Sequence, residues 1–322
     1  MASGFPYERG LQDVGNSIYA YLQPDGGWGW SNAGLITDAG HALLVDTLFD
    51  VPLTWQMLED MKRQVPAAAH IGTLVNSHAN GDHTFGNQLL DGAEIIASEQ
   101  TARDMETVPL LETMRSQKAR IDELGIAGRM FAQTLGPFDL DSVTMVYPTR
   151  TFRESLTLYV GAKRVELIEV GPAHTKSDIL VHVPEDRVVF TADILFIDGH
   201  PIMWDGPLEN WIAALDRILA MDVEVIVPGH GPITDKRGVA ALREYFVYVD
   251  REARTLHDAG VPPYEAARRI DMSAYDHWID GERIAVNVAN IYRHLDGETT
   301  PPDRLESFTE MAKLRFGEQV GT

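Results

Sequence analysis

Short hydrophobic runs separated by polar turns fill the first quarter of the chain and predict β-strands. The runs are either apolar throughout or alternate between apolar and polar residues, which are the patterns of buried and half-buried strands. They occupy residues 17–22, 33–37, 41–46 and 72–75. Between the last two, residues 53–63 place apolar side chains at helical spacing and predict an amphipathic helix.

The pattern becomes helical over residues 98–135, where methionines, leucines and an isoleucine recur at three- and four-residue spacing. We expect this segment to form a helical insertion above the sheet. Strand-like runs then return, and helical patterns follow them to near the end of the chain. The strands are predicted at residues 155–160, 164–170, 179–183, 188–191 and 223–227, and the helices at 208–221, 239–259, 263–270, 281–295 and 302–316.

Two similar halves, each with a cluster of strands and neighbouring helices, predict an α/β fold. In such a fold two sheets pack face to face and helices cover the outside. The chain contains no internal repeat, low-complexity tract or Ser/Gly-rich linker. We therefore expect a single domain over residues 1–322, with a core at about 15–235 and a helical C-terminal extension at about 236–322.

Composition excludes several kinds of chemistry. Cysteine is absent, so disulfides, thiolate metal ligands and cysteine nucleophiles are excluded. The chain carries 27 Lys and Arg against 48 Asp and Glu, and this formal charge of −21 disfavours nucleic acid as a partner. No apolar run is long enough to span a membrane and the N-terminus lacks a signal-peptide pattern, so we expect a cytoplasmic protein without membrane contact.

Side chains that can bind a metal follow four of the predicted strands. Loops at strand ends are held by a rigid scaffold and commonly carry binding residues. The residues are His78, Asn80, Asp82 and His83 after the strand that ends at Val75, His174 after residue 170, Asp193 after Thr191 and His230 after Val227. A single histidine of this kind is more often a hydrogen-bonded or exposed side chain, but the whole set favours a site for Zn²⁺, Fe²⁺ or Mn²⁺.

The order and spacing of these residues resemble the metallo-β-lactamase superfamily, whose signature is H-x-H-x-D-H followed by distant His, Asp and His. Here the signature reads His78-Ala79-Asn80-Gly81-Asp82-His83, and the match covers about residues 15–235. The resemblance implies a four-layer αββα sandwich and a hydrolase that uses a metal-bound hydroxide. It also implies that Asp46, at the end of an early strand, supports the metal-binding loop without binding the ion.

The resemblance assigns the ligands to two metal sites. His78 and His174 correspond to ligands of the first site, Asp82, His83 and His230 to ligands of the second, and Asp193 to a bridging position. Asn80 replaces the middle histidine of the signature, and its amide oxygen is a much weaker donor than an imidazole nitrogen. We therefore expect one ion, with zinc as the first choice, in the second site. Two ions, of which the first is loosely bound, are the alternative.

With one ion bound, His78 and His174 can act as general base, general acid or hydrogen-bond donors. Together with Asp82 they are the expected catalytic residues, and ligation of a second ion is the alternative for the two histidines. Asn80 is expected to be a weak ligand or a substrate contact. The Asn80-Gly81 pair also predicts a tight turn in which glycine supplies conformational freedom.

Tryptophans lie close in sequence to the expected site, with Trp28 and Trp30 in a Gly-rich segment and Trp204 after Asp193. They predict a pocket for a small apolar or aromatic substrate, with ordinary packing or an oligomer contact as the alternative. The amphipathic C-terminal helices indicate a homodimer. Polar residues in these helices could close one side of the pocket or form the dimer contact: Arg283, Asn287, Tyr292 and Arg293.

The expected reaction is hydrolysis of an ester, lactone or thioester, or hydrolytic dehalogenation of an aryl halide. Dehalogenation is included because the replaced histidine Asn80 and the long helical tail resemble chlorothalonil hydrolytic dehalogenase. The competing function is a non-catalytic ligand-binding protein on a metallo-hydrolase fold that has lost activity. Four intact ligands of the second site argue against that alternative.

Overall fold

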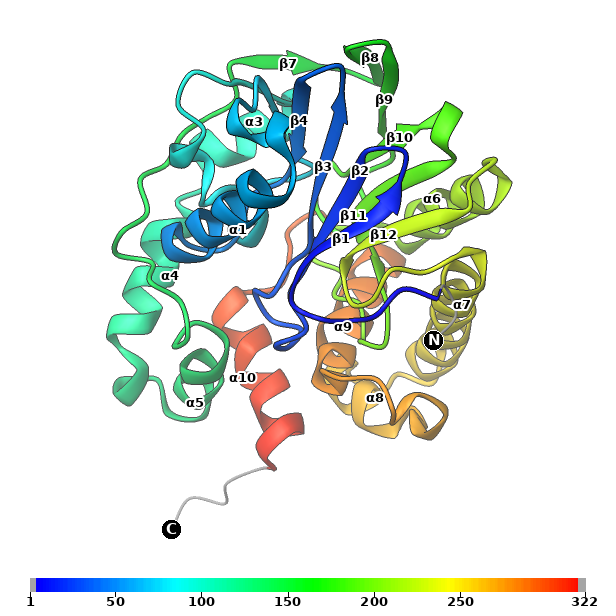
Figure 1. Ribbon diagram of the computed structural model, residues 1–322. Coiled ribbons are helices and arrows are strands. Elements are labelled where there is room, and N and C mark those ends of the chain that lie inside the picture. The colour runs from blue at the N-terminus through cyan, green and yellow to red at the C-terminus, as the bar shows by residue number, and fades with distance from the viewer. Residues whose placement is uncertain (1–3, 318–322) are drawn as a thin grey trace.

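Two β-sheets form the centre of the protein, whose computed structural model describes residues 4–317 (Figure 1). The first sheet contains seven strands in chain order. The pairs from β1 to β4 are antiparallel, and the pairs from β4 to β7 are parallel. The strands are β1 (Gly10–Gly15), β2 (Ile18–Leu22), β3 (Ala33–Asp38), β4 (His41–Val45), β5 (Thr73–Val75), β6 (Glu94–Ser98) and β7 (Arg150–Phe152).

The second sheet contains five strands in the order β12-β11-β10-β9-β8. Neighbouring strands are antiparallel except for β11 and β12, which are parallel. Because β11 and β12 run in the same direction, their carboxyl ends lie at the same edge of this sheet. The strands are β8 (Ser155–Val160), β9 (Lys163–Glu169), β10 (Ile179–Val183), β11 (Val188–Phe196) and β12 (Val225–His230).

The two sheets pack face to face over a shared hydrophobic core. Ile36 and Val45 of the first sheet and Val181 and Phe190 of the second belong to one buried cluster. Gly34 allows a close approach of the sheets, because a Cβ atom there would lie 2.3 Å from the ring of Phe190. This packing buries the inner face of each sheet, as in other two-sheet sandwiches.

Helices cover the outer face of each sheet, which confirms the predicted four-layer αββα fold (Figure 1). Met57 and Met61 of α1 pack in one cluster with Leu44 of the first sheet. Trp211 of α6 packs in another cluster with Leu195 of the second sheet. The helices are α1 (Val51–Gln64), α2 (Gly81–Thr84), α3 (Glu99–Thr107), α4 (Leu110–Ala119), α5 (Gly125–Thr134), α6 (Leu208–Ala220), α7 (Lys236–Asp258), α8 (Pro263–Arg269), α9 (Ile284–Leu295) and α10 (Arg304–Phe316).

The C-terminal extension is helical, as predicted, and contacts two parts of the core. Val239 of α7 and Ile291 of α9 belong to the cluster that covers the second sheet. Helix α10 reaches the helical insertion, where Phe308 packs on Phe131 of α5 with ring centroids 4.8 Å apart (Figure 1). The extension therefore joins the second sheet's helical layer to the insertion. Within residues 4–317, no helix has the length and hydrophobicity needed to cross a membrane.

Three strands, β1, β6 and β7, are not predicted by the hydrophobic pattern. β1 is an edge strand with a register shift between Asp13 and Gly15, and β7 is only three residues long. β6 offers a single short apolar run at residues 95–97. Pairing with a neighbouring strand, which a local pattern does not reveal, determines these three elements.

Two of the candidate ligands lie within strands and not after them, which corrects the prediction. Strand β11 continues through Asp193 to Phe196, with a register shift beside Ala192, whose φ is 43°. Strand β12 includes His230 as its last residue. The polar ligands interrupt the hydrophobic pattern, but the pairing of the two strands continues to their positions.

Candidate metal centre

The six predicted metal ligands come from separate segments and meet at one place. His78 lies in the loop after β5, Asp82 and His83 in α2, His174 between β9 and β10, Asp193 in β11 and His230 at the end of β12. Five of the six are buried, and Asp82 is partly accessible. The structure thus brings together every residue that the sequence predicts as a ligand.

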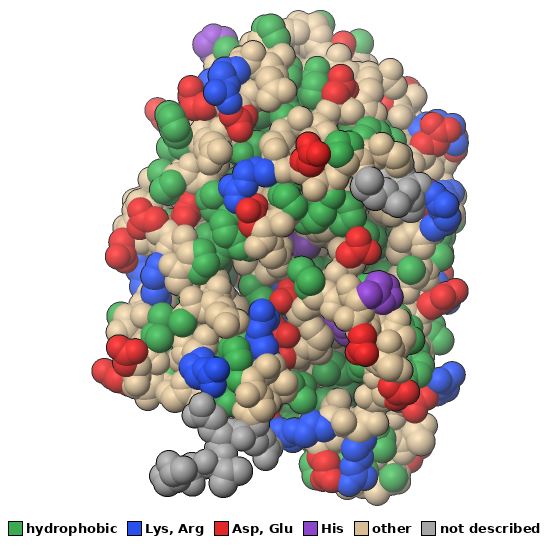
Figure 2. Space-filling model, turned by 60° about the horizontal axis from the view of Figure 1, so that its bottom comes forward, with side chains coloured by type: hydrophobic (Ala, Val, Ile, Leu, Met, Phe, Trp, Pro, Cys, Tyr) green, Lys and Arg blue, Asp and Glu red, His purple; other side chains and the backbone are tan. Residues whose placement is uncertain are grey.

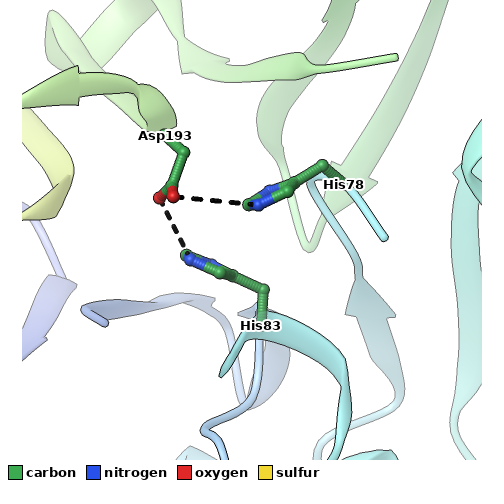
Figure 3. A group of neighbouring side chains, drawn as sticks. All are labelled: His78, His83 and Asp193. Atoms are coloured by element: carbon green, nitrogen blue, oxygen red, sulfur yellow. Dashed lines mark ion pairs between the residues drawn. The ribbon is translucent and has the colours of Figure 1, made fainter. Parts of the chain in front are cut away.

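The Asp193 carboxylate lies at the centre of this group. Its Oδ2 atom lies 3.3 Å from Nε2 of His174 and 3.4 Å from Nε2 of His230. The same oxygen lies 3.9 Å from Nε2 of His78, whereas Oδ1 lies 3.1 Å from Nε2 of His83. Figure 3 shows the imidazoles of His78 and His83 both directed at this carboxylate. Asp193 is therefore placed to bridge two neighbouring positions, as the resemblance implies.

Asp82 completes a second group of candidate ligands. Its Oδ2 atom lies 3.4 Å from Nε2 of His230 and 4.0 Å from Nε2 of His83. Two sets of ligand atoms lie within 4.8 Å of one another, namely those of His78, His83 and Asp193 and those of Asp82, His83 and His230. This spacing allows one atom from each residue to bind a common ion.

Each of the four imidazoles uses its Nδ1 atom for a hydrogen bond that points away from the centre. The acceptors are Oδ2 of Asp46 for His83 (2.9 Å), the carbonyl of Ile202 for His174 (2.6 Å), the carbonyl of Trp30 for His230 (3.1 Å) and the hydroxyl of Ser77 for His78 (2.9 Å). When a ring carries a proton on Nδ1 alone, the lone pair on Nε2 faces the centre. Outer hydrogen bonds of this kind orient the imidazoles of metal sites.

Asp46 holds two of these imidazoles, one directly and one through Ser77. Its carboxylate accepts hydrogen bonds from His83, from the Ser77 backbone N–H (2.7 Å) and from the Ser77 hydroxyl (2.7 Å). The Ser77 hydroxyl in turn accepts from Nδ1 of His78. The φ of Asp46 is 62°, a left-handed conformation that costs energy in a non-glycine residue and often occurs at functional sites. These contacts are those expected of a residue that supports the metal-binding loop.

Several inner atoms of the centre lack hydrogen-bond partners. Nε2 of His78 is buried without a hydrogen-bond partner among residues 4–317, and Nε2 of His83 and Oδ1 of Asp193 have none there apart from their 3.1 Å approach to each other. Buried polar atoms are nearly always satisfied, so a group of unsatisfied ones requires an explanation. A divalent cation provides it, because such an ion accepts lone pairs from imidazole and carboxylate together. The residues therefore fit a metal ion.

The buried carboxylates stabilise positive charge at the centre. Burial acts to lower the pKa of His230, but Asp193 and Asp82 outweigh it and raise this pKa to about 9. Burial also acts to lower the pKa of His83, but Asp193, Asp82 and Asp46 have the larger effect and raise this pKa well above its usual range. Protons on these two imidazoles balance the carboxylates when no ion is bound. A divalent cation can take their place.

Asn80 contacts the centre through His174. Its Nδ2 atom lies 2.8 Å from Nε2 of His174. Because Nδ1 of His174 donates to the Ile202 carbonyl, Nε2 is the acceptor and the Asn80 amide is the donor. Burial lowers the pKa of His174 to about 4, which keeps the ring neutral. The amide therefore occupies the lone pair with which His174 would bind an ion in the first site.

Two glycines provide space at the centre. A Cβ atom on Gly229 would lie 2.0 Å from Oδ1 of Asp193, and one on Gly81 would lie 2.5 Å from the ring of Phe85. Gly81 begins helix α2 and does not have a positive φ, which corrects the expectation that it supplies conformational freedom to a turn. Sequence reasoning missed Gly229, although its position beside His230 was a signal.

A cavity of about 230 Å³ opens beside the centre and is mostly apolar. Trp28 and Trp204 line it. The Trp30 side chain does not, which differs from the expectation, because its ring packs 4.9 Å from that of Phe138. Only the backbone carbonyl of Trp30 reaches the centre, through His230. The centre contributes part of the cavity wall through Asn80, Asp82, His174, Asp193 and His230.

The C-terminal extension also contributes to the cavity wall. Arg283 lines the cavity, which fits one of the two roles considered for it, whereas Asn287 is buried and donates to the carbonyl of Pro201 (3.0 Å). Arg304 and Phe308 of α10 line the cavity as well, and sequence reasoning missed both. No local motif marks these two residues, since only the packing of α10 against the insertion brings them to the site.

Comparison with known proteins agrees with this description. Residues 26–230, more than half of the chain, match the metallo-beta-lactamase superfamily. A linear primary-alkylsulfatase of Pseudomonas sp. (strain ATCC 19151) is 24% identical in an alignment 261 residues long, which covers 71% of this chain and 48% of that protein. The chain therefore spans about half the length of this relative.

Two solved structures share the architecture. The sec-alkylsulfatase Pisa1 from Pseudomonas sp. matches with a TM-score of 0.66 and 16% identity, over 89% of this chain and 50% of that chain. A metallo-beta-lactamase from Pontibacter korlensis matches with a TM-score of 0.54 and 17% identity, over 74% of this chain and 99% of that chain. The fold and the site define an αββα sandwich with a His- and Asp-rich centre. Together with the sequence match over residues 26–230, they show that the chain belongs to the metallo-beta-lactamase superfamily.

Proposed function

We propose that the protein is a metal-dependent hydrolase that acts on a small apolar or aromatic molecule. The observation that carries this proposal is the group of buried, unpartnered ligand atoms beside an open apolar cavity. Structural metal sites are closed, whereas catalytic sites keep a position open to substrate. A ligand-binding protein without catalysis gives no reason for imidazoles held so that all four Nε2 atoms face one point.

The ion is proposed to bind mainly to Asp82, His83, Asp193 and His230. Two imidazoles and two carboxylates suit zinc, with Fe²⁺ and Mn²⁺ as alternatives. His78 and His174 remain beside this position. The hydrogen bond from Asn80 to His174 supports one ion over two, because it engages the nitrogen that the first site needs.

An ion held by these residues would supply a Lewis acid and would lower the pKa of water at the site from about 16 to about 7. Asp82 and His174 both line the cavity. The Asp82 oxygen that does not bind the ion can accept a proton there, and Nε2 of His174 can accept or return one when the Asn80 amide donates to the substrate instead. The Asn80 amide can donate a hydrogen bond to a substrate oxygen. His78 does not line the cavity, and its proposed role is restricted to the electrostatics of Asp193.

The cavity wall supports a substrate with a hydrophobic body. Apolar side chains make up most of the wall, among them Val108, Leu110, Met114, Phe131, Leu135 and Phe308. Esters, lactones, thioesters and aryl halides are the proposed substrate classes. Because the relative described above is named as an alkylsulfatase, sulfate esters are added to this range.

Hydrolysis by the metal-loaded protein of a panel containing these substrate classes tests the proposal. At least one class is expected to be cleaved, and Asp82→Ala is expected to lower kcat/KM by at least about 100-fold, the usual order for loss of a central electrostatic group. Asp91→Ala, which changes an exposed aspartate, should have no effect. Wild-type rates from Asp82→Ala, or no turnover of any class with metal bound, would contradict the proposal.

A homodimer and a cytoplasmic location stay predictions from the sequence. We propose the homodimer on the amphipathic character of the C-terminal helices. Sedimentation of the purified protein at several concentrations measures its molecular mass, and a mass of 35.8 kDa throughout would contradict the dimer.

A further inference from the structure

Two arginines from the C-terminal extension line the cavity beside the metal centre. Arg283 lies in the 3-10 helix η6 (Gly281–Arg283), and Arg304 is the first residue of α10. Figure 2 shows the face to which the C-terminal helices belong, with basic and acidic side chains around exposed hydrophobic ones. A guanidinium in a largely apolar cavity requires either an acidic partner or an anionic ligand. The two arginines differ in this respect.

Arg283 is buried and has an acidic partner. Its Nη2 atom lies 3.2 Å from Oδ2 of Asp280, and its Nη1 donates to the carbonyl of His200 (2.8 Å). Its guanidinium also covers the ring of Trp28, with Cζ 4.3 Å from the ring centroid. Arg283 therefore fixes Trp28 in the cavity wall, and its charge is balanced by Asp280.

Among the described residues, Arg304 has no carboxylate in contact. Among residues 4–317 none forms an ion pair with it, and Asp205 attracts it only from a distance. Arg304 is exposed as a residue, but burial lowers the pKa of its guanidinium to about 10. The guanidinium stacks on Trp204, with Cζ 3.7 Å from the ring centroid. A guanidinium stacked on an aromatic face keeps its N–H donors at the edge, in a fork that matches two oxygens of one anion. These donors are therefore available to a ligand.

Arg304 lies between the cavity beside the metal centre and a second cavity of about 400 Å³, and it lines both. Both cavities are lined by Arg304, Trp204 and Asn80. Trp204 is tied to the centre, because its backbone N–H donates to the carbonyl of His174 (3.0 Å). A ligand that extends from the centre into the second cavity therefore lies against the stacked pair of Arg304 and Trp204.

We propose that Arg304 binds an anionic group of the substrate, so that the protein acts on molecules that combine a negative charge with a hydrophobic body. This inference rests on the proposed hydrolase function and narrows its substrate class. A carboxylate, sulfonate or sulfate accepts hydrogen bonds from the edge of Arg304, and the hydrophobic body packs on Leu110, Met114 and Phe308. Four carboxylates also line the second cavity, those of Asp104, Glu106, Glu112 and Asp205, so the anionic group is proposed to lie at the edge of the Arg304 guanidinium and not deeper in that cavity.

Binding of hexane-1-sulfonate and hexan-1-ol to the metal-loaded protein tests the anion site without turnover. The two probes share a tail and differ in charge. Arg304→Gln is expected to weaken sulfonate binding at least about tenfold, since a charge-assisted hydrogen bond is lost, and to leave hexanol binding unchanged. Arg304→Lys should retain part of the affinity. Equal sulfonate binding by the wild type and Arg304→Gln would overturn the inference.

Arg251→Gln is a matched control, because Arg251 also stacks on an aromatic ring, that of Tyr248 at 5.3 Å, but does not line either cavity. It should change the binding of neither probe. A loss of sulfonate affinity in Arg251→Gln equal to that in Arg304→Gln would assign the effect to overall charge and would also overturn the inference.

Paired ester substrates separate this inference from the hydrolase proposal. Phenyl hemisuccinate carries a carboxylate and phenyl butyrate is a neutral ester of similar size. Arg304→Gln is expected to raise KM for the hemisuccinate about tenfold and to leave kcat/KM for the butyrate unchanged. An equal loss on both esters would show that Arg304 is only structural and would contradict an anion site. If the protein hydrolyses neither ester, the full substrate panel decides the hydrolase proposal, whereas the sulfonate measurement still decides the anion site.

Discussion

Gly229 lies so close to the Asp193 carboxylate that any side chain at this position must move it. In Gly229→Ala the new methyl group would lie 2.0 Å from Oδ1 of Asp193 and 2.6 Å from the backbone carbon of Ala192. Because Asp193 faces all four imidazoles, we expect metal affinity to fall by about 10- to 100-fold, as when the support of a ligand is removed. Competition with a chromogenic chelator measures this affinity.

Gly72→Ala is the matched control, because a Cβ atom on Gly72 meets nothing within 4 Å and its φ is not positive. It should bind metal like the wild type. If Gly229→Ala also keeps the wild-type affinity, Asp193 is not held at the position described here.

At the scale of single residues, the side chains that meet at the centre and the position of Asp46 beside them were predictable, but the support of His174 and His230 was not. His78, Asp82 and His83 lie in one short motif that resembles the superfamily signature, so they could be recognised from the sequence. The groups that orient the other two imidazoles are the backbone carbonyls of Ile202 and Trp30, which every residue type possesses. A backbone carbonyl that accepts such a hydrogen bond therefore cannot be recognised from the sequence.

Among the helices, α10 connects the cavity wall to the insertion through Phe308. Its ring lies 4.8 Å from that of Phe131, 5.5 Å from that of Trp28 and 6.1 Å from that of Trp204 between centroids. Since Phe308 is partly buried, Phe308→Ala is expected to lower the free energy of unfolding by about 2 kcal/mol, less than for a fully buried phenylalanine. Urea denaturation measures this change. A destabilisation below about 0.5 kcal/mol would contradict a packing role.

Leu305→Ala on the same helix is the control for this prediction. Leu305 is 40% exposed, so its truncation should change the free energy of unfolding much less than that of Phe308. Equal losses in the two variants would indicate a general effect on helix α10 and not the loss of the aromatic contacts.

The elements with strong periodicity were predictable and the weak ones were not. Helix α6 and the C-terminal helices have clear apolar faces, and strands β3 and β10 are nearly continuous apolar runs. β7 has a single buried residue, Phe152, and owes its existence to pairing with β6. The same limit applies to Arg304, whose place at the cavity depends on how α10 packs.

For the molecule as a whole, metal binding is expected to depend on pH. The pKa of His230 is raised to about 9 and that of His83 is raised well above its usual range, so both rings are protonated at pH 7 when no ion is bound. An ion must displace these protons, and its affinity should therefore rise with pH up to about 9 and fall as the pH decreases.

Calorimetry in buffers of different ionisation enthalpy measures this proton release. We expect about two protons per ion at pH 7, one from each of these imidazoles. His41→Gln changes an exposed histidine and should leave the number unchanged. Binding without proton release would contradict the charge balance described for the centre.

The number of metal ions per chain tests the central claim most directly. The protein is equilibrated with excess zinc, freed of unbound metal by gel filtration and analysed by mass spectrometry of the metal content. The account predicts one zinc per chain in the wild type and about two in Asn80→His, because an imidazole at position 80 completes the first site. A wild-type protein that retains no zinc, or that already retains two, would contradict it.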